Sequence, residues 1–410
     1  MKISIVICIY NTEKIYFEKC LKSIYKNTLL STDYEIVVID DGSTIDYSDL
    51  IKASGARYIK TENRGIFRAR LLGISEARGD YIAFVDSDDT VSYNYHLPMM
   101  VEAQRTASDI VFNDWAFHTE RTKYYCKNDS TISRDFLYEG DDVLPAFAAN
   151  EGREHSYFVL WNKLFSAKIL KDSIPFLEPI ANRPERFNYS EDVLICFAAM
   201  SRARRIKNLH TGYYFYRIHA SQTVNVVSEE RLRSHIMNMS ETFDIMTSSV
   251  SDHPKKEEIL ASINKWRALM SRTHYSYAVA NKYTVLFDLI KERYHTDKLG
   301  RSKYRDNSAY SNNKVLPMNF NELEDFLREI YNTKEPVNIN PRRGNSYIKI
   351  NTIYLSAFNG NISFSDDGII PPKDKVKFKD KILMNKFVYS LGLILFKKGS
   401  KLRAFLKKHL

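Results

Sequence analysis

The chain has 410 residues, of which 44% are hydrophobic and 27% are charged, and its formal net charge at pH 7 is +10. This length suffices for two or three domains, and the 27 tyrosines and 23 phenylalanines exclude a wholly disordered chain. Four cysteines without paired spacing exclude a disulfide scaffold and a cysteine-based zinc module, and they favour a reducing compartment. No apolar run reaches the ~18 residues of a membrane-spanning helix.

The first 90 residues alternate between buried strands and helical patterns. Strands are expected over 3–9, 34–40 and 81–85, because these runs are mostly apolar and rich in β-branched or aromatic residues, and a short strand is expected over 57–60. Apolar side chains at helical spacing lie between them, over 17–24 and 67–77. This alternation predicts an α/β fold with a doubly wound, mostly parallel sheet flanked by helices.

Polar residues follow three of these strands. They are Tyr10 and Asn11, then Asp40 and Asp41, then Asp86, Ser87 and Asp88. In a doubly wound sheet, ligands bind at the carboxyl ends of the strands. Two carboxylates at positions i and i+2 of a turn can approach one hard cation, and oxygen ligands suit Mg²⁺ or Mn²⁺ bridged to a diphosphate. The alternative is a solvated turn in which aspartates only cap the backbone.

Four motifs together resemble glycosyltransferase family 2. They are ISIVICIYN at 3–11, VIDDGS at 38–43, the Asn, Gly and Ala-Arg positions of 63–73, and GDYIAFVDSDD at 79–89. The resemblance is strong over 1–115 and weak to about 225, and it departs at Cys8, where the family usually has proline. It implies an inverting nucleotide-sugar enzyme with the Rossmann-like GT-A fold.

The resemblance also assigns nucleotide contacts. Tyr10, with Asn11 beside it, would lie near the uracil of a UDP-sugar. Asp41, or its neighbour Asp40, would accept a hydrogen bond from the base. The alternative for Asp40 and Asp41 is an ordinary turn, which the following glycine and serine favour.

The diphosphate and the cation would lie at the next strand end. The resemblance places Arg70, or Arg68, near the base or the diphosphate. Asp86, together with Ser87, would lie near the ribose and the metal, and Asp88 would be the principal ligand of Mn²⁺ or Mg²⁺.

A pair of acidic residues, Glu191 and Asp192, opens a later helical stretch. In the resembled family such a pair supplies the catalytic base, and we assign that role to Asp192, with Glu191 orienting it or the acceptor. An acceptor hydroxyl needs a carboxylate to take its proton, and partial burial would raise the pKa of that carboxylate towards the working pH. The alternative is a helix start at which Ser190 caps and acidic residues are simply favoured.

Two further segments resemble the family. In WNKLF at 161–165, Trp161 offers a face for sugar stacking and Lys163 could approach a phosphate or anchor Asp192; a core tryptophan with a surface lysine is the alternative. In YRIHAS at 216–221, Arg217 suits phosphate recognition and His219 would be a further metal ligand or diphosphate donor.

The rest of the chain is expected to be mainly helical and to end in a basic segment. Residues 1–225 would form the catalytic domain, 226–345 a helical accessory region and 346–410 the C-terminal region. Residues 373–410 hold 12 Lys and Arg against 2 Asp, which is the whole excess charge of the chain. A nucleic-acid-binding domain would carry a basic face of its own, whereas the excess charge of this chain lies entirely in its last residues. No nucleic-acid partner is therefore expected.

This basic segment reads as an interfacial amphipathic helix. It would hold the enzyme, as a cytoplasmic peripheral protein, on the anionic inner face of a bacterial membrane. The alternative is a helix packed on the chain's own body or on a partner subunit, which leaves the oligomeric state open.

The sequence therefore predicts a hexosyltransferase that moves a sugar from a nucleotide donor, expected to be a UDP-sugar, to a glycan or lipid-linked glycan of capsule, lipooligosaccharide or another surface polysaccharide. Two alternatives stay open: a haloacid-dehalogenase-like phosphatase with Asp86 as nucleophile, and a non-catalytic membrane-associated scaffold. A nicotinamide-linked oxidoreductase is disfavoured, because no G-x-G-x-x-G follows the first strand.

Overall fold

The computed structural model describes residues 2–26, 29, 31–118, 125–127, 135–150, 155–183, 186–217, 228–281, 283–298, 301–302, 363–365 and 368–370. His219 and the basic segment 373–410 lie outside these residues, so the roles expected for them stay predictions. In the part of the chain that is described, every helix is too short or too polar to cross a bilayer.

One ten-stranded sheet forms the centre of the fold, in the order β3-β2-β1-β4-β9-β6-β10-β5, with β7 added on β6 and β8 on β10. Its first four strands are parallel. β9 is antiparallel to both of its neighbours, while β6 and β10 are parallel to each other. The strands are β1 (Ile3–Ile9), β2 (Tyr34–Asp40), β3 (Arg57–Lys60), β4 (Tyr81–Phe84), β5 (Thr90–Val91), β6 (Ile110–His118), β7 (Tyr125–Lys127), β8 (Leu137–Glu139), β9 (Lys163–Ser166) and β10 (Arg205–Arg217).

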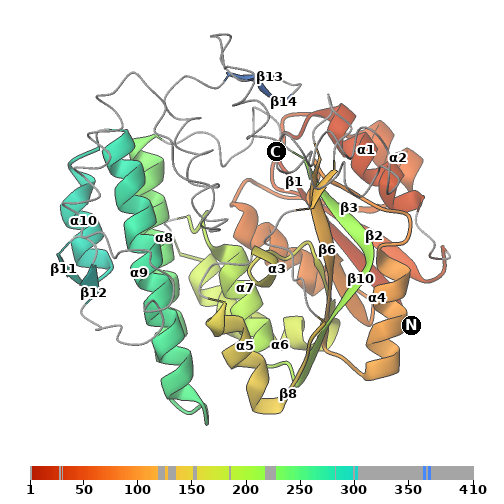
Figure 1. Cartoon of the computed structure of the whole chain (residues 1–410). Helices are drawn as coiled ribbons and strands as arrows, with labels where there is room; N and C mark the ends of the chain where they lie inside the picture. The colour runs from red at the N-terminus through yellow and green to blue at the C-terminus, as the bar shows by residue number, and fades with distance from the viewer. Residues whose placement is uncertain are drawn as a thin grey trace, which may run out of the picture.

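Helices cover both faces of the sheet (Figure 1). Along β1, successive side chains point to opposite faces: Ile5 and Ile7 pack with Phe17 of α1, whereas Val6 packs with Phe67 of α3. Burial on both faces explains why this strand reads as a continuous apolar run. The helices of this part are α1 (Lys14–Tyr25), α2 (Ser48–Ser54), α3 (Ile66–Glu76), α4 (His96–Thr106), α5 (Val143–Ala149), α6 (Ala167–Ala181) and α7 (Glu191–Met200), with 3₁₀ turns at Gly140–Asp142 and His155–Tyr157.

Three further helices, α8 (Glu229–Ser248), α9 (Lys256–Ala280) and α10 (Leu286–Arg293), follow the sheet (Figure 1). One face of α8, which includes Ile236 and Phe243, is apolar and buried, as is Trp266 of α9. Trp266 stacks on Phe158 at a ring-centroid distance of 4.2 Å, so these helices share one hydrophobic core with α5 and α7. Two small antiparallel strand pairs follow in the described part of the chain: β11 (Thr296–Lys298) with β12 (Arg301–Ser302), and β13 (Ser363–Ser365) with β14 (Gly368–Ile370).

The sheet order brings the three polar strand ends together. β2, β1 and β4 are immediate neighbours, so the segments after Ile9, Asp40 and Phe84 leave the same edge of the sheet. The Asp41 N–H still bonds the Ile9 carbonyl at 2.9 Å, which continues the ladder into the loop. This confirms the expected α/β architecture and places the predicted nucleotide residues at one edge.

Gly79 allows β4 to pair closely with β1. A Cβ added at Gly79 would lie 2.6 Å from the Ser4 nitrogen and 2.7 Å from the Lys2 carbonyl oxygen, so backbone would have to move. We predict that Gly79→Ala lowers the free energy of unfolding by about 2 kcal/mol or more. The control Gly55→Ala should lose only about 1 kcal/mol, because Gly55 has a positive φ of 61° but open space around it. Urea unfolding measures both, and equal losses would contradict the steric explanation.

Candidate active site

The loop after β1 is tied to the loop after β2. Asn11 adopts a left-handed backbone conformation, with φ of 52°. Its side-chain oxygen accepts from the Thr44 N–H at 2.8 Å, and its own N–H donates to the Ser43 hydroxyl at 3.0 Å. The adjacent Tyr10 is 54% exposed. Asn11 therefore orders the loops, and Tyr10 presents an accessible ring at the sheet edge.

The two aspartates after β2 have different surroundings. Asp40 is fully buried and accepts from the Ser43 N–H at 2.7 Å and from the Tyr58 hydroxyl. Asp41 accepts from the backbone N–H groups of Arg64 and Gly65, at 2.7 and 2.9 Å. Asp40 thus stabilises its own turn, while Asp41 fixes the loop that precedes α3.

Arg70 of α3 joins the end of β4 to the start of α7. Its guanidinium donates to Glu191 Oε1 at 2.6 Å and lies 3.5 Å from Asp86 Oδ1. The side chains of Arg70 and Glu191 are each only 10% exposed. Burial raises the pKa of Glu191 to about 7; the Arg70 charge opposes this rise and the Asp192 charge adds to it.

Carboxylates gather next to this ion pair. Burial raises the pKa of Asp86, Arg70 lowers it, and the charges of Asp88 and Asp192 raise it further. Asp192 is partly buried in the first turn of α7, where its Oδ1 accepts from the Val193 N–H at 2.8 Å. Asp86 and Asp88 offer oxygen ligands, and a bound cation would relieve the repulsion between their negative charges. The chemistry of this edge therefore suits Mg²⁺ or Mn²⁺. Within the described residues, no three His, Cys, Asp or Glu side chains converge as a ready-made metal site.

A buried network that the sequence did not reveal holds the Asp86–Asp89 turn. Asp89 is 1% exposed and accepts from the Tyr214 hydroxyl and the Arg217 N–H, each at 2.7 Å. Tyr214 in turn accepts from the Asp86 N–H at 3.0 Å, and the Arg217 side chain donates to the Asp88 carbonyl at 2.6 Å. Arg217 is therefore next to the turn but 1% exposed, with its guanidinium 4.5 Å from the Tyr16 ring centroid. In the sequence, Asp89 stood out only as the third acidic residue of the run 86–89.

Lys163 and Trp161 lie inside the protein. Lys163 is 1% exposed, and its ammonium donates to the Ser156 and Val159 carbonyls. Burial lowers the pKa of Lys163 to about 8, which the Asp192 charge opposes. Trp161 is 6% exposed and stacks on Tyr214 at 4.4 Å, so it packs in the core and the sugar-stacking expectation is wrong.

The helix-cap explanation for the Glu191–Asp192 pair also needs correction. Ser190 precedes α7 with φ of 63° and makes no side-chain cap bond. Its hydroxyl instead lies 2.8 Å from the Thr242 hydroxyl of α8.

Ser87, the remaining predicted residue of the turn after β4, is 7% exposed, and its hydroxyl lies 2.7 Å from the Thr12 hydroxyl. The structure thus brings Asp86 and Glu191 together at Arg70, while the side chains of Lys163 and Arg217 lie buried inside the protein.

Comparison with known proteins identifies the class. Residues 4–167 match the model of glycosyl transferase family 2. This part of the chain is a family 2 glycosyltransferase domain, and the family expected from the strand-end motifs is confirmed.

Relatives agree with this class. The chain is 26% identical over 275 residues to the putative glycosyltransferase EpsH of Bacillus subtilis, covering 66% of this chain and 75% of EpsH. It is 25% identical to the glycosyltransferase GlyA of Streptococcus pneumoniae, covering 60% of this chain and 35% of GlyA. The crystal structure of S. aureus TarS 1–349 aligns with a TM-score of 0.51 and 19% identity over 72% of this chain and 83% of TarS 1–349, which shows a shared fold.

The Arg70 ion pairs predict a specific stability pattern. Arg70→Met should lower the free energy of unfolding by about 3 kcal/mol, because Glu191 remains buried and Asp86, whose side chain is 33% exposed, remains beside it without a counter-charge. Adding Glu191→Gln should recover part of this loss, because one of the two stranded charges is removed. Lys22→Met breaks an exposed pair with Glu18 and should cost less than about 1 kcal/mol. Chemical unfolding at pH 7.5 measures the set, and strict additivity of Arg70→Met and Glu191→Gln would contradict the direct coupling.

Proposed function

We propose that this protein is an inverting glycosyltransferase that moves a sugar from a UDP-sugar to a hydroxyl of a glycan or lipid-linked glycan during surface-polysaccharide synthesis. The observation that carries the proposal is the ion-paired cluster of Arg70, Asp86 and Glu191, at the edge where β1, β2 and β4 end. A transferase needs a nucleotide site, charge stabilisation for the departing diphosphate and a base for the acceptor, and this edge offers residues suited to each task.

The nucleotide is proposed to bind between Tyr10 and Asp41. Tyr10 supplies an exposed aromatic face for a base. The Asp41 oxygens each accept one backbone N–H, and a carboxylate oxygen has a second lone-pair site for the N–H of a uracil. Asp40 is the weaker choice because it is fully buried under its own turn.

The divalent cation is proposed to bind at Asp88 and Asp86, with His219 as a further ligand. When bound, Mg²⁺ or Mn²⁺ would neutralise charge that develops on the departing diphosphate. The Asp89–Tyr214 bonds keep the turn that carries these ligands in one conformation. Arg70 adds positive charge at the same edge without itself being a strong hydrogen-bond partner of Asp86, since that contact is 3.5 Å.

Asp192 is the proposed catalytic base and Glu191 a positioning residue. Glu191 Oε1 already accepts from Arg70 at 2.6 Å, which holds the first turn of α7 against α3. Asp192 is adjacent, partly buried and close enough for its charge to raise the pKa of Asp86. It can therefore take a proton from an acceptor hydroxyl near the donor sugar. Attack on the face opposite the diphosphate inverts the configuration at C1.

The donor and the cation can be tested without knowing the acceptor. Purified protein should hydrolyse one member of a UDP-sugar panel in the presence of Mn²⁺ or Mg²⁺, and excess EDTA should abolish the release of UDP. Asp88→Asn should reduce this hydrolysis at least 10²-fold, while the exposed Asp49→Asn control should retain it. Equal hydrolysis of a GDP- or dTDP-sugar would contradict the uridine assignment, and full activity in EDTA would contradict the metal assignment.

The base can be tested once a donor and an acceptor are in hand. Asp192→Asn should lower kcat for transfer by about 10²–10⁴-fold, because proton removal from the acceptor is lost. Its affinity for UDP should stay within a few-fold of the wild type, as measured by calorimetry. Asp172→Asn, which removes an exposed carboxylate paired with Lys168, is the matched control and should transfer normally. Full transfer by Asp192→Asn would refute this choice of base.

A further inference from the structure

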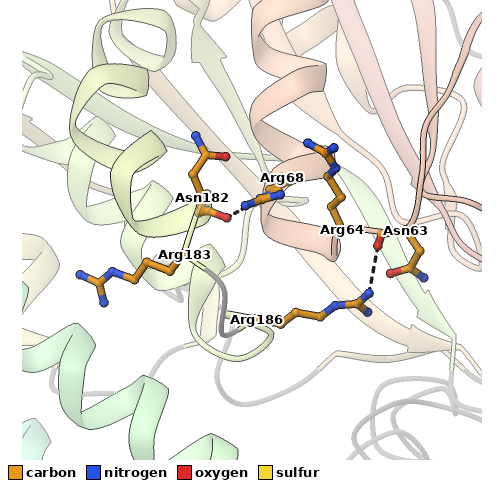
Figure 2. A pocket seen from close by; sticks show the side chains of 7 residues that line it. Asn63, Arg64, Arg68, Asn182, Arg183 and Arg186 are labelled. Atoms are coloured by element: carbon orange, nitrogen blue, oxygen red, sulfur yellow. Dashed lines mark hydrogen bonds between the residues drawn. The ribbon is translucent and has the colours of Figure 1, made fainter.

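A pocket of about 280 Å³ lies between the N-terminal end of α3 and the C-terminal end of α6 (Figure 2). Three stretches of chain line it: the loop into α3 with its first turns, the end of α6, and the segment that leads to α7. Arg68, the alternative that the resemblance offered to Arg70, lines this pocket, but no other residue assigned above to donor, cation or base does. Its lining residues are Asn63, Arg64, Arg68, Ala181, Asn182, Arg183 and Arg186.

Four of these seven residues are arginines, so the pocket is strongly basic. Among the described residues, two glutamates pair with them: Glu62 lies 3.6 Å from Arg64, and Glu241 pairs with Arg183. The Arg64 and Glu62 side chains are 59% and 87% exposed, and a pair in that setting offsets little charge. The pocket therefore has a surplus of guanidinium charge, which favours an anionic ligand.

Two of the arginines are held in place by backbone carbonyls, as Figure 2 shows. Arg68 donates through Nε to the Ala181 carbonyl, and Arg186 donates through Nη2 to the Asn63 carbonyl at 2.9 Å. A guanidinium has five N–H donors in a planar fork that matches the oxygens of a phosphate or carboxylate. Each of these contacts uses one donor, so the backbone orients the fork and leaves further N–H groups for a ligand.

The pocket adjoins the proposed active site through two short connections. Arg64, on its rim, gives its backbone N–H to Asp41, where the nucleotide base is proposed to bind. Arg186, on the other rim, precedes the proposed base Asp192 by six residues, a path of at most ~21 Å even when fully extended. A chain whose hydroxyl lies at Asp192 can therefore reach the pocket.

The charge of the donor does not explain the pocket. The diphosphate is proposed to lie at Asp86 and Asp88 with the cation, and the pocket's neighbour Asp41 faces the uncharged base. With the donor placed in this way, an anion at the arginines is assigned to the other substrate. The acceptor hydroxyl is proposed to meet the catalytic base Asp192 on α7. Residues 186–192 connect this position directly to the pocket.

We propose that this arginine pocket binds an oxyanion group, a phosphodiester or a carboxylate, on the acceptor glycan. The inference rests on the proposed function and narrows its acceptor to an anionic polysaccharide. The pocket lies away from the hydroxyl that reacts, so it selects and orients the acceptor chain.

Binding of defined probes tests this proposal on the full chain. Affinities are measured by calorimetry at 150 mM salt for a glycerol-phosphate oligomer, an oligogalacturonate and a neutral maltooligosaccharide of similar length. The wild type should bind at least one anionic probe at least tenfold more tightly than the neutral probe. The tighter anionic probe shows whether phosphodiester or carboxylate is the preferred group.

The double variant Arg64→Ala/Arg183→Ala leaves Arg68 and Arg186 in place. It removes the two arginines whose side chains donate no hydrogen bond to a backbone carbonyl among the described residues of the pocket wall. It should bind the preferred anionic probe at least tenfold more weakly than the wild type. The control Lys168→Ala/Arg233→Ala removes the same number of charges from exposed helical pairs with Asp172 and Glu229. This control should bind like the wild type, and thermal unfolding of both variants verifies that they are folded.

Three results would overturn the proposal: equal binding of neutral and anionic probes, equal weakening in the charge-matched control, or weakening of UDP binding alone in the double variant. The last result would assign the pocket to the donor. Hydrolysis of UDP-sugars by the wild type distinguishes a failure of the acceptor-pocket proposal from a failure of the proposed function. Its absence would refute the proposed function, whereas its presence without selective anion binding would refute only the acceptor pocket.

Discussion

The buried Arg70 guanidinium is the interaction on which the candidate site depends. It contacts Glu191, which is 121 residues away in the chain, and Asp86 at the end of β4. A buried ion pair is retained only where its partners compensate one another, since each charge alone would be costly to desolvate. Arg70 thereby fixes the distance between the carboxylates proposed for the cation and the helix turn proposed for acceptor activation.

The parallel order β2-β1-β4 provides the second constraint. Neighbouring parallel strands deliver their following loops to one edge, so Tyr10, Asp41 and Asp86 can act on one ligand although they are far apart in sequence. The later strands serve this edge indirectly. Tyr214 of β10 reaches back to bond Asp89, so the second half of the sheet stabilises a turn that belongs to the first.

Helices α8 to α10 share a hydrophobic core with the helices that cover the sheet rather than forming a separate unit. Trp266 of α9 stacks on Phe158, and Thr242 of α8 meets the hydroxyl of Ser190 at the start of α7. Helix α7 is therefore packed between Arg70 on one side and α8 on the other. This packing explains how Ser190 can hold a left-handed conformation, which costs a non-glycine residue about 1 kcal/mol, without serving as a cap.

The sequence by itself determined the strands, their polar ends and the family, because these features are local. β-branched runs give strands buried on both faces, and short acidic or Asn-containing turns follow them. Only the tertiary structure decided that Glu191 pairs with Arg70, that Trp161 stacks on Tyr214 in the core, and that four arginines from three segments form one pocket. These contacts join residues separated by about 50 to 120 positions, and periodicity along the chain carries no information on which distant side chains the packing of strands and helices will bring together.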